Sequence, residues 1–392
     1  MAKVKFGDVV RETKEKVDRS NNPYKFYVAG DHMDTEDLSI RRKGCFATDD
    51  VGPAFIRVFH EGQVLYGSRR TYLKKIAVAD FDGVTANTTF VLETKDENVL
   101  RQRLIPFIMY TEKFTEWSVK KSKGSTNPYV LFCDLADYEF DLPSVEKQDE
   151  LAELLWGMVE AKEAYQELLR QTDEVVKAQF IEMFGDPTSN PNGWTKLTVR
   201  DAVKRGYIAR PLDGNHGAKH PKGDDYVPEG VPFIMAQDLK DKQVDFNSCH
   251  FITEKQASTL KKGWAKTGDV LLTNKGTIGR VAIVQESAYE NMLLTPQITY
   301  YRCLNGIDNE YLAGYFITDF FVNQLEKLTT GTTRASVTIT QQENLELIIP
   351  PVDMQKEFVV FVKHSDKSKI ELEQAIKSLE AIYNKIISEN LG

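Results

Sequence analysis

The chain has 392 residues, of which 41% are hydrophobic and 28% charged, and its formal net charge is −8 at pH 7. These proportions are ordinary for a soluble globular protein, and the length predicts two or more domains. No run approaches the roughly 18 apolar residues of a membrane span, and the N-terminus lacks a signal-peptide core, so we expect a cytoplasmic protein without a membrane partner. The four cysteines lie far apart with no CxxC spacing, so neither a zinc site nor a disulfide framework is indicated.

The negative charge is concentrated in one segment. Residues 141–186 contain 12 acidic and 4 basic side chains, whereas the larger blocks on either side are close to neutral. A phosphate backbone responds to local charge and not to the total. The net charge therefore does not exclude a nucleic-acid partner.

Residues 1–142 have the pattern of a mixed α/β domain. Runs rich in β-branched and aromatic residues predict strands at Ala54–Phe59, Lys75–Val78 and Thr88–Leu92. A helical pattern follows over Glu97–Glu116. The block is long enough to bury a core of its own.

Residues 143–186 predict a single long helix from Val145 to Phe184, which would reach on the order of 60 Å at 1.5 Å per residue. Gly185 and Pro187 supply the stop signal. Apolar or small residues alternate at spacings of three and four, which is the heptad pattern of a helix that packs along another helix. The predicted seam consists of Leu151, Leu154, Met158, Ala161, Tyr165, Leu168, Thr172 and Val175.

Residues 187–350 begin after a polar linker and again predict a mixed α/β domain. Strand patterns occur at Val281–Val284 and Gln297–Tyr301, and a helical pattern covers Asn309–Leu328. Residues 351–392 predict a second long helix. Its seam consists of Phe358, Phe361, Ser365, Ser368, Leu372, Ala375, Leu379, Ile382 and Ile386.

Each of the first eight seam positions of the second helix lies 207 residues after its counterpart in the first. A separate amphipathic surface helix is the alternative for each segment, but the shared register favours two helices that pair with one another, antiparallel.

The repeat extends beyond the helices, because residues 62–175 as a whole recur 206–207 positions further on. Gly62-Gln63-Val64-Leu65 returns as Gly268-Asp269-Val270-Leu271, and Gly124-Ser125-Thr126 returns as Gly331-Thr332-Thr333. The similarity is weakest before residues 62 and 268. A period this long indicates tandem domains and not a solenoid. We therefore predict two similar mixed α/β domains separated by two long antiparallel helices, with pseudo-twofold symmetry.

A basic turn follows the Gly-x-Val-Leu run in each copy. Arginine and lysine reach phosphates or guanine edges, and asparagine can read adenine. A solvated hairpin with basic decoration is the alternative, but the recurrence favours a function in DNA binding. The candidates are Arg69, Arg70, Tyr72 and Lys74 in the first copy, and Asn274, Lys275, Thr277 and Arg280 in the second.

A second polar turn precedes each long helix. Its hydroxyls, glycine and cations suit phosphate contacts, which position a protein without specifying sequence. A plain exposed loop explains either copy equally well. The candidates are Lys121, Lys123 and Ser125 in the first copy, and Thr332, Thr333 and Arg334 in the second.

Catalytic patterns are missing from the sequence. The six histidines are scattered, and no HExxH, GxSxG, Walker A or dinucleotide-binding pattern occurs. Asn22-Pro23-Tyr24 and Asn127-Pro128-Tyr129 lack the second proline of an adenine methyltransferase motif, so ordinary turns explain them. We expect no catalytic residue, no metal and no cofactor on this chain.

Two segments carry a family resemblance. Gly268-Asp269-Val270-Leu271-Leu272-Thr273-Asn274-Lys275-Gly276-Thr277-Ile278-Gly279-Arg280 is similar to the "GDIL…RGTIGK" segment of type I restriction–modification specificity subunits. Ile348-Ile349-Pro350-Pro351-Val352-Asp353-Met354-Gln355 resembles their "LPPLxEQ" segment. The first copy carries both in weaker form, with Arg69-Arg70-Thr71-Tyr72-Leu73-Lys74 and a single proline at Pro143. The resemblance covers essentially the whole chain.

The resemblance implies two target-recognition domains (1–142 and 187–350), each followed by a long spacer helix (143–186 and 351–392). Each domain would read one half of a bipartite double-stranded DNA target, and the helices would set the gap. Methylation subunits, expected to be two, and restriction/translocase subunits would be partners in a bacterial or archaeal cytoplasm. S-adenosylmethionine, ATP and Mg²⁺ would bind to those partners. Two rival hypotheses remain: a stand-alone DNA methyltransferase or nuclease, and a coiled-coil scaffold that binds only proteins.

Overall fold

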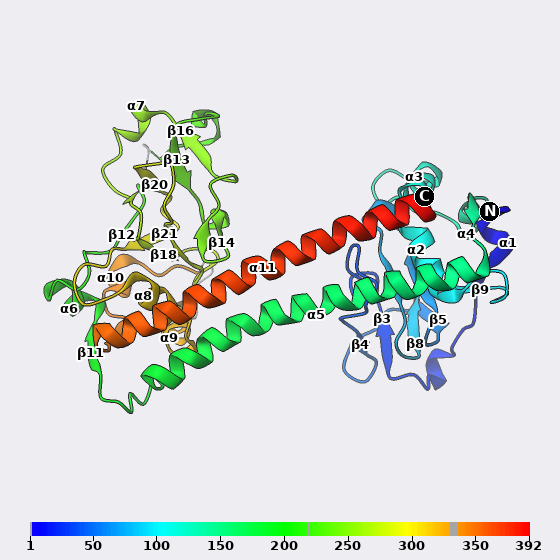
Figure 1. The fold of residues 1–392 in the computed structure, drawn as a ribbon, viewed down its shortest axis with the longest axis horizontal. Coiled ribbons are helices and arrows are strands. Elements are labelled where there is room, and N and C mark those ends of the chain that lie inside the picture. Colours follow the sequence, from blue (N-terminus) through cyan, green and yellow to red (C-terminus); the bar gives the residue numbers. More distant parts are fainter. Residues whose placement is uncertain (1, 218–219, 330–334) are drawn as a thin grey trace. The chain divides into compact units, whose positions relative to one another are not determined.

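The structure is a computed structural model that describes residues 2–217, 220–329 and 335–392. The chain divides into two compact units. Unit 1 comprises Met1–Gln166 and Glu373–Gly392, and unit 2 comprises Glu167–Leu372. Each unit holds one α/β domain and parts of both long helices, α5 (Val145–Phe184) and α11 (Val352–Asn390) (Figure 1).

The domain of unit 1 contains two four-stranded sheets. The first has the order β2 (Val10–Thr13), β9 (Thr89–Thr94), β6 (Val64–Gly67), β7 (Ile76–Val78). The second has the order β4 (Gly44–Cys45), β3 (Phe26–Val28), β8 (Gly83–Ala86), β5 (Phe55–Phe59), in which only β3 and β8 run parallel.

Strand β1 (Ala2–Lys5) pairs antiparallel with β10 (Glu139–Leu142) and so joins the two ends of the first domain. Its helices are α1 (Phe6–Val9), α2 (Ile105–Tyr110), α3 (Glu112–Lys121) and α4 (Phe132–Ala136).

The domain of unit 2 repeats this arrangement. A six-stranded sheet has the order β12 (Leu212–Asp213), β21 (Ile298–Tyr301), β18 (Val270–Thr273), β19 (Val281–Ile283), β15 (Gln243–Val244), β14 (Leu239–Lys240). A four-stranded sheet has the order β16 (His250–Ile252), β13 (Val231–Ile234), β20 (Met292–Leu294), β17 (Trp264–Ala265), again with one parallel pair, β13 and β20.

Strand β11 (Thr195–Thr198) pairs with β22 (Glu346–Ile349) as β1 does with β10. The helices of this domain are α6 (Val199–Lys204), α7 (Glu254–Ala257), α8 (Asn309–Phe316), α9 (Asp319–Thr329) and α10 (Ile339–Gln342). The matching strand orders confirm two similar mixed α/β domains. They also carry the repeat into the segments before Gly62 and Gly268, where the sequence similarity is weakest.

The central strand of each domain is buried on both faces. Val64 and Tyr66 of β6 join the core that contains the helices, whereas Leu65 between them joins the core beneath the second sheet. In β18, Val270 and Leu272 face one core and Leu271 the other. A strand covered on both sides needs an unbroken apolar run, which explains the repeated Val-Leu segments.

The predicted strands are confirmed, but each predicted helix that follows them is two helices. The run expected over Glu97–Glu116 becomes α-helical only at Ile105 and breaks at Thr111 between α2 and α3. The run over Asn309–Leu328 breaks at Thr318 between α8 and α9. Thr111 Oγ1 donates to the Ile108 carbonyl at 2.8 Å and accepts from the Phe114 amide at 3.2 Å. The hydroxyl thus ends one helix and caps the next.

Thr318 repeats this hydroxyl geometry, donating to Tyr315 at 2.7 Å and accepting from Phe321 at 3.4 Å. All three residues lie 207 positions after their counterparts. The helix break is therefore part of the repeat.

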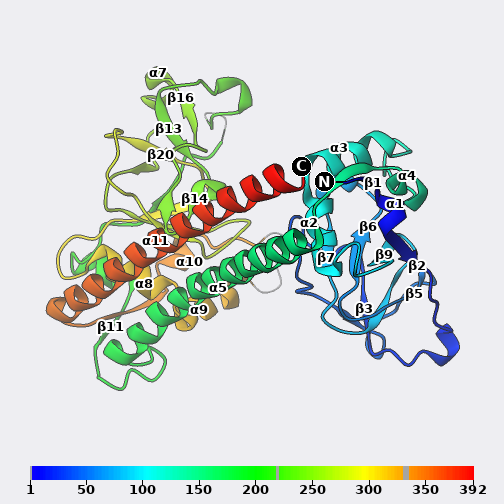
Figure 2. The ribbon, with the colours of Figure 1, turned by 45° about the vertical axis from the view of Figure 1, so that its right-hand side comes forward.

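Within each unit, the segments of the two long helices lie side by side and run antiparallel (Figures 1 and 2). In unit 1, Lys162 of α5 forms an ion pair with Glu380 of α11 at 2.8 Å. In unit 2, Phe180 and Phe184 of α5 pack against Phe358 of α11, with ring centroids 5.4 and 5.5 Å apart. The start of one helix therefore contacts the end of the other in each unit, as predicted.

The predicted seam is wrong at five positions, one of which is Ser368. Leu154, Leu168, Val175 and Ile382 are exposed, with exposed fractions of 46 to 53%. Buried positions outside the predicted seam include Leu155, Val176 and Phe180 in α5, and Val362 and Ile387 in α11. Most of them lie one residue after a predicted seam position, which corresponds to a rotation of about 100° around the helix axis. The helices pack against their domains as well as against each other, and this additional contact determines which face is buried.

The other seam positions agree with the prediction to different degrees. Leu151 and Phe358 are buried. A further set is partly buried, namely Met158, Ala161, Tyr165, Thr172, Phe361, Ser365, Leu372, Ala375, Leu379 and Ile386. Ser368 is exposed.

The ion pair between the helices is itself repeated. Lys162 pairs with Glu380 in unit 1, and Lys369 pairs with Asp173 in unit 2. Both lysines and both acids are 207 residues apart. In unit 2, Lys242 of the domain adds a second ammonium, 3.3 Å from the Asp173 carboxylate.

Replacing Asp173 with asparagine is expected to lower the free energy of unfolding by roughly 1–3 kcal/mol, because two mostly buried ammonium groups lose their counter-ion. Their side chains are only 28% and 18% exposed, whereas Asp173 itself is 49% exposed, which moderates the loss. Glu380→Gln is the matched control, and its loss is expected to be smaller because Glu380 has one lysine partner among the described residues. Urea unfolding of the intact chain measures both.

The effect of Asp173→Asn has a defined pH dependence. Burial raises the pKa of Asp173, but Lys369 and Lys242 outweigh it, and the pKa lies below its ordinary value of 3.8. The stability contributed by the carboxylate is therefore fully present above pH 3.8 and is lost as the pH falls through the lower folded value. A stability difference that persists unchanged below this window would contradict the assignment.

Candidate nucleic-acid interface

In each domain the two predicted polar turns come together. We call the β6–β7 and β18–β19 connections (68–75 and 274–280) the hairpin loops, and residues 122–130 and 335–338 the post-helix loops. In unit 1 the Arg70 amide donates to the Pro128 carbonyl at 2.7 Å, and the Val130 amide donates to Ser68 at 2.9 Å. Segments more than 50 residues apart in sequence thus form one surface.

The second domain joins its loops in the same way. The Gly276 amide donates to the Ala335 carbonyl at 3.1 Å, and the Val337 amide donates to Asn274 at 2.8 Å. Because these are backbone bonds, loop geometry does not depend on which exposed side chains the loops carry.

Buried polar groups anchor the hairpin loops. Ser68 Oγ donates to the Thr88 carbonyl at 2.6 Å, and the buried hydroxyl of Thr71 lies 3.3 Å from that of Ser122. In unit 2, Asn274 is only 5% exposed, and its Nδ2 donates to Thr299 Oγ1 at 2.9 Å. Asn274 therefore supports the loop from inside, and its amide is not presented to a base.

Several candidate side chains are exposed on these loops. Arg69, Arg70 and Tyr72 are exposed in the first domain, and Lys275, Thr277 and Arg280 in the second. Among the described residues, none forms an ion pair with Arg69, Arg70, Lys275 or Arg280. Their charges are available to an anionic ligand.

Other candidates have partners within the protein. Lys74 is 13% exposed, and its ammonium lies 2.6 Å from Glu112 and 3.3 Å from Glu36. Lys123 is paired with Asp134 at 2.9 Å, and Lys121 lies over the Trp117 ring at 4.7 Å. Ser125 is exposed. Thr332, Thr333 and Arg334 lie outside the described residues.

The sequence interpretation missed a buried amide that fastens each long helix to its domain. Gln355 Oε1 accepts from the Asp308 amide at 2.8 Å, and its Nε2 donates to the carbonyls of Gly306 at 3.0 Å and Pro350 at 2.8 Å. Gln148 makes the same three bonds in unit 1, with Arg101, Val99 and Pro143 at 2.9 to 3.0 Å. Each partner lies 207 residues from its counterpart, and both glutamines are fully buried.

The acid of the Gly268-Asp269 segment is structural as well. Asp269 is 1% exposed, and both its carboxylate oxygens accept from Arg302 at 2.8 Å. This bidentate pair raises the pKa of Arg302. In unit 1 the corresponding position is Gln63, whose amide donates to Glu93 at 2.7 Å. The signal available in the sequence was the recurrence of these two positions, Gln148 with Gln355 and Gln63 with Asp269. Their hydrogen-bond partners lie far away in sequence.

The described part of the chain contains no group of three or more His, Cys, Asp or Glu side chains placed to hold a metal ion. No helix within residues 2–217, 220–329 and 335–392 is long and apolar enough to cross a membrane.

The structure defines a protein of two similar α/β domains. Each domain is followed by one long helix of an antiparallel pair, and each presents basic loops that backbone hydrogen bonds join. The family model described as type I restriction modification DNA specificity domain matches residues 212–381. Over these residues the chain is similar to the DNA specificity domain of type I restriction–modification systems, and over most of its length it is similar to type I restriction enzyme specificity subunits.

Particular relatives agree with this assignment. The type I restriction enzyme MjaIX specificity subunit of Methanocaldococcus jannaschii is 24% identical over 355 residues, covering 85% of this chain and 77% of that protein. The EcoBI specificity subunit of Escherichia coli is 29% identical over 102 residues, which are 26% of this chain and 20% of that protein.

Two solved structures share the fold. One comes from a study of complex assembly and conformational transition of the type I R-M system, with a TM-score of 0.61, 18% identity, and coverage of 100% of this chain and 97% of that one. The other is the type I restriction–modification S subunit from M. genitalium, with a TM-score of 0.54, 11% identity, and coverage of 99% and 95%.

Proposed function

We propose that this chain is the non-catalytic, DNA-reading subunit of a type I restriction–modification complex, in which each domain reads one half of a bipartite duplex target. The observation that carries this proposal is the repeated pair of backbone-joined loops, which present Arg69 and Arg70 in one domain and Lys275 and Arg280 in the other. Cations of this kind bind phosphates and read guanine edges.

The proposed partners are double-stranded DNA, two methylation subunits, and restriction/translocase subunits. Methyl transfer and cleavage, with S-adenosylmethionine, ATP and Mg²⁺, are assigned to those subunits, in the cytoplasm. The paired long helices would act as the spacer between half-sites.

Exposed apolar residues on α5 support protein docking there. Leu168 and Val175 are exposed seven residues apart, and each follows an exposed glutamate, Glu167 or Glu174. Leu154 follows Glu153 in the same pattern. Exposed apolar side chains with a polar rim are typical of protein–protein interfaces. We propose this helix face as the docking surface for a methylation subunit.

Domain exchange tests the proposed function. The chain is co-expressed with its methylation subunits, and modified-base sequencing is expected to reveal one split motif with adenine methylated in both halves. Exchanging residues 1–142 for the first domain of another specificity subunit is expected to change one half of the motif and leave the other half and the gap unchanged. A motif unaffected by the exchange would contradict the proposal.

A further inference from the structure

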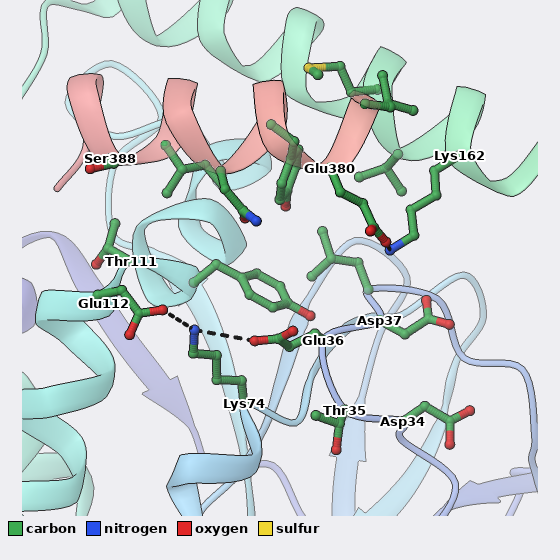
Figure 3. A pocket seen from close by; sticks show the side chains of 18 of the residues that line it. Asp34, Thr35, Glu36, Asp37, Lys74, Thr111, Glu112, Lys162, Glu380 and Ser388 are labelled. Carbon is green, nitrogen blue, oxygen red and sulfur yellow. Dashed lines mark hydrogen bonds and ion pairs between the residues drawn. The ribbon is translucent and has the colours of Figure 1, made fainter. Parts of the chain in front are cut away.

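Unit 1 contains a cavity of 830 Å³ where its domain meets the two long helices (Figure 3). The loop 34–38 and the α2–α3 junction form the domain side, and turns of α5 and α11 form the other. Its volume falls in the range of small-molecule sites, roughly 300–1,000 Å³.

Unit 2 has a pocket at the corresponding place in the repeat, but its volume is only 140 Å³. Tyr110 and Tyr383 line the large cavity, and their counterparts Ile317 and Val176, displaced by 207 residues, line the small one. The domain loop contributes to both, through residues 34–38 in unit 1 and 241–243 in unit 2. One junction is nearly filled and the other is open.

A lysine from the domain occupies the junction in unit 2. Lys242 extends from the loop to Asp173 of α5, at 3.3 Å. The counterpart of Asp173 is Glu380, which lines the cavity of unit 1 and whose one partner among the described residues is Lys162. The counterpart of Lys242 is Thr35, so the unit 1 loop lacks this ammonium and lines the cavity with Asp34, Glu36 and Asp37.

The cavity of unit 1 has more carboxylates than cations. The acids are Asp34, Glu36, Asp37, Glu112, Glu163 and Glu380, and the cations are Arg41, Lys74, Lys113 and Lys162. Two groups have one more carboxylate than cation: Glu36 and Glu112 share Lys74 (Figure 3), and Asp37 and Glu163 share Arg41. Glu380 is paired with Lys162. Two separated anionic groups match a ligand with a cation at each end.

The remaining lining provides a hydroxyl and an apolar surface. The Tyr110 hydroxyl is buried and has no hydrogen-bond partner among the described residues. A buried phenol without a partner costs free energy, which a ligand that donates to it would recover. Leu38, Met158, Val159, Leu379 and Ile387 offer contacts for methylene groups.

We propose that this cavity binds a linear polyamine, whose ammonium groups take the place that Lys242 fills in unit 2. The methylene chain would lie against the apolar wall, and an ammonium would donate to the Tyr110 hydroxyl. The cavity shares Lys74 with the hairpin loop of unit 1 but includes neither Arg69 nor Arg70, so the proposal does not depend on the proposed function.

Calorimetric titration of the full chain, without DNA, tests the proposal. Spermidine and 1,5-diaminopentane are expected to saturate a single site, and pentylamine, with one charge, is expected to bind at least tenfold more weakly. MgCl₂ at equal charge is the control for non-specific attraction. The proposal would be overturned if MgCl₂ displaced the bound diamine as effectively as additional diamine does. A titration that gave more than one site per chain would also overturn it.

Three variants locate the site. Tyr110→Phe removes only the unpartnered hydroxyl, and Glu36→Gln leaves Lys74 paired with Glu112; each is expected to weaken diamine binding at least fivefold. Asp366→Asn, in the small pocket of unit 2, is the matched control and should leave binding unchanged. Equal effects in all three would overturn the assignment. Because a variant can unfold, the diamine-induced rise in melting temperature is also measured, and it should be reduced in the two cavity variants and retained in Asp366→Asn.

A lysine side chain from a partner protein is the alternative source of an ammonium. If the chain alone binds no diamine, and a cross-link from Glu380 to a methylation-subunit lysine forms in the complex, the cavity is a protein-docking site and the polyamine proposal is wrong.

Discussion

Replacing Gln355 with methionine is expected to destabilise unit 2 by roughly 3–6 kcal/mol, because one buried and two partly buried backbone groups are each left without a hydrogen-bond partner worth about 1–3 kcal/mol. The groups are the Asp308 amide and the carbonyls of Gly306 and Pro350, and the glutamine side chain is fully buried. A decrease of this size is a large part of a typical stability of about 5–15 kcal/mol. Urea unfolding of the intact chain measures it.

Gln148→Met is the matched variant in unit 1 and is expected to destabilise by a similar amount, because it breaks the same three bonds. Gln374→Met is the control, since Gln374 is exposed on the same helix as Gln355. A melting temperature of Gln355→Met equal to that of Gln374→Met would show that the buried amide is dispensable.

Gln355→Glu separates the effect of the hydrogen bonds from that of side-chain volume. Above its pKa, the new carboxylate would face two carbonyl oxygens and could not donate to either, whereas the protonated form could donate to one. Its pKa in the folded state is therefore expected to be raised, so the destabilisation should lessen as the pH falls through that value. The destabilisation in Gln355→Met should show no such pH dependence.

Replacing both Arg69 and Arg70 with alanine is expected to weaken DNA binding by the assembled methylation complex, by roughly 5- to 150-fold for each of the two arginines that reads a base. Each arginine that binds a phosphate should instead, on removal, lower the steepness of the salt dependence by about 0.9. Both arginines are exposed and unpaired among the described residues, so their removal should not unfold the domain. Fluorescence anisotropy across a salt series measures both quantities.

Lys275→Ala with Arg280→Ala is the corresponding variant in the second domain. If each domain reads one half-site, the first pair of substitutions should relax specificity in one half and the second pair in the other. Lys367→Ala, an exposed lysine on α11, controls for the removal of charge alone. Unchanged binding and specificity in Arg69→Ala, Lys275→Ala and Arg280→Ala would remove the hairpin loops from the DNA-binding site.

Features of the fold that depend on short-range patterns were predicted correctly. The bounds of α5 and the strands at β5, β7 and β21 follow from local periodicity and stop signals. The helix breaks were missed because a capping threonine inside a periodic run gives only a weak local signal. Thr111 and Thr318 become visible as breaks only through their hydrogen bonds.

For the candidate site too, the sequence predicted the features that a local pattern marks and missed those that depend on distant contacts. The sequence located both pairs of polar turns, because glycine, hydroxyls and cations recur there. It could not separate Arg69, which faces solvent, from Lys74, which is held by two glutamates from other segments. It also could not show that Asn274 is buried beneath the loop.

By itself, the sequence determined the tandem repeat, the two long helices, the family resemblance and the places where cations cluster, because a local pattern or an internal offset encodes each of these. Only the tertiary structure decided which helix face is buried, how the distant turns join, and what Gln148 and Gln355 hold together. Those outcomes depend on contacts between segments far apart in the chain. Burial and hydrogen bonding of a side chain are set by whatever packs against it, and no local pattern records that partner.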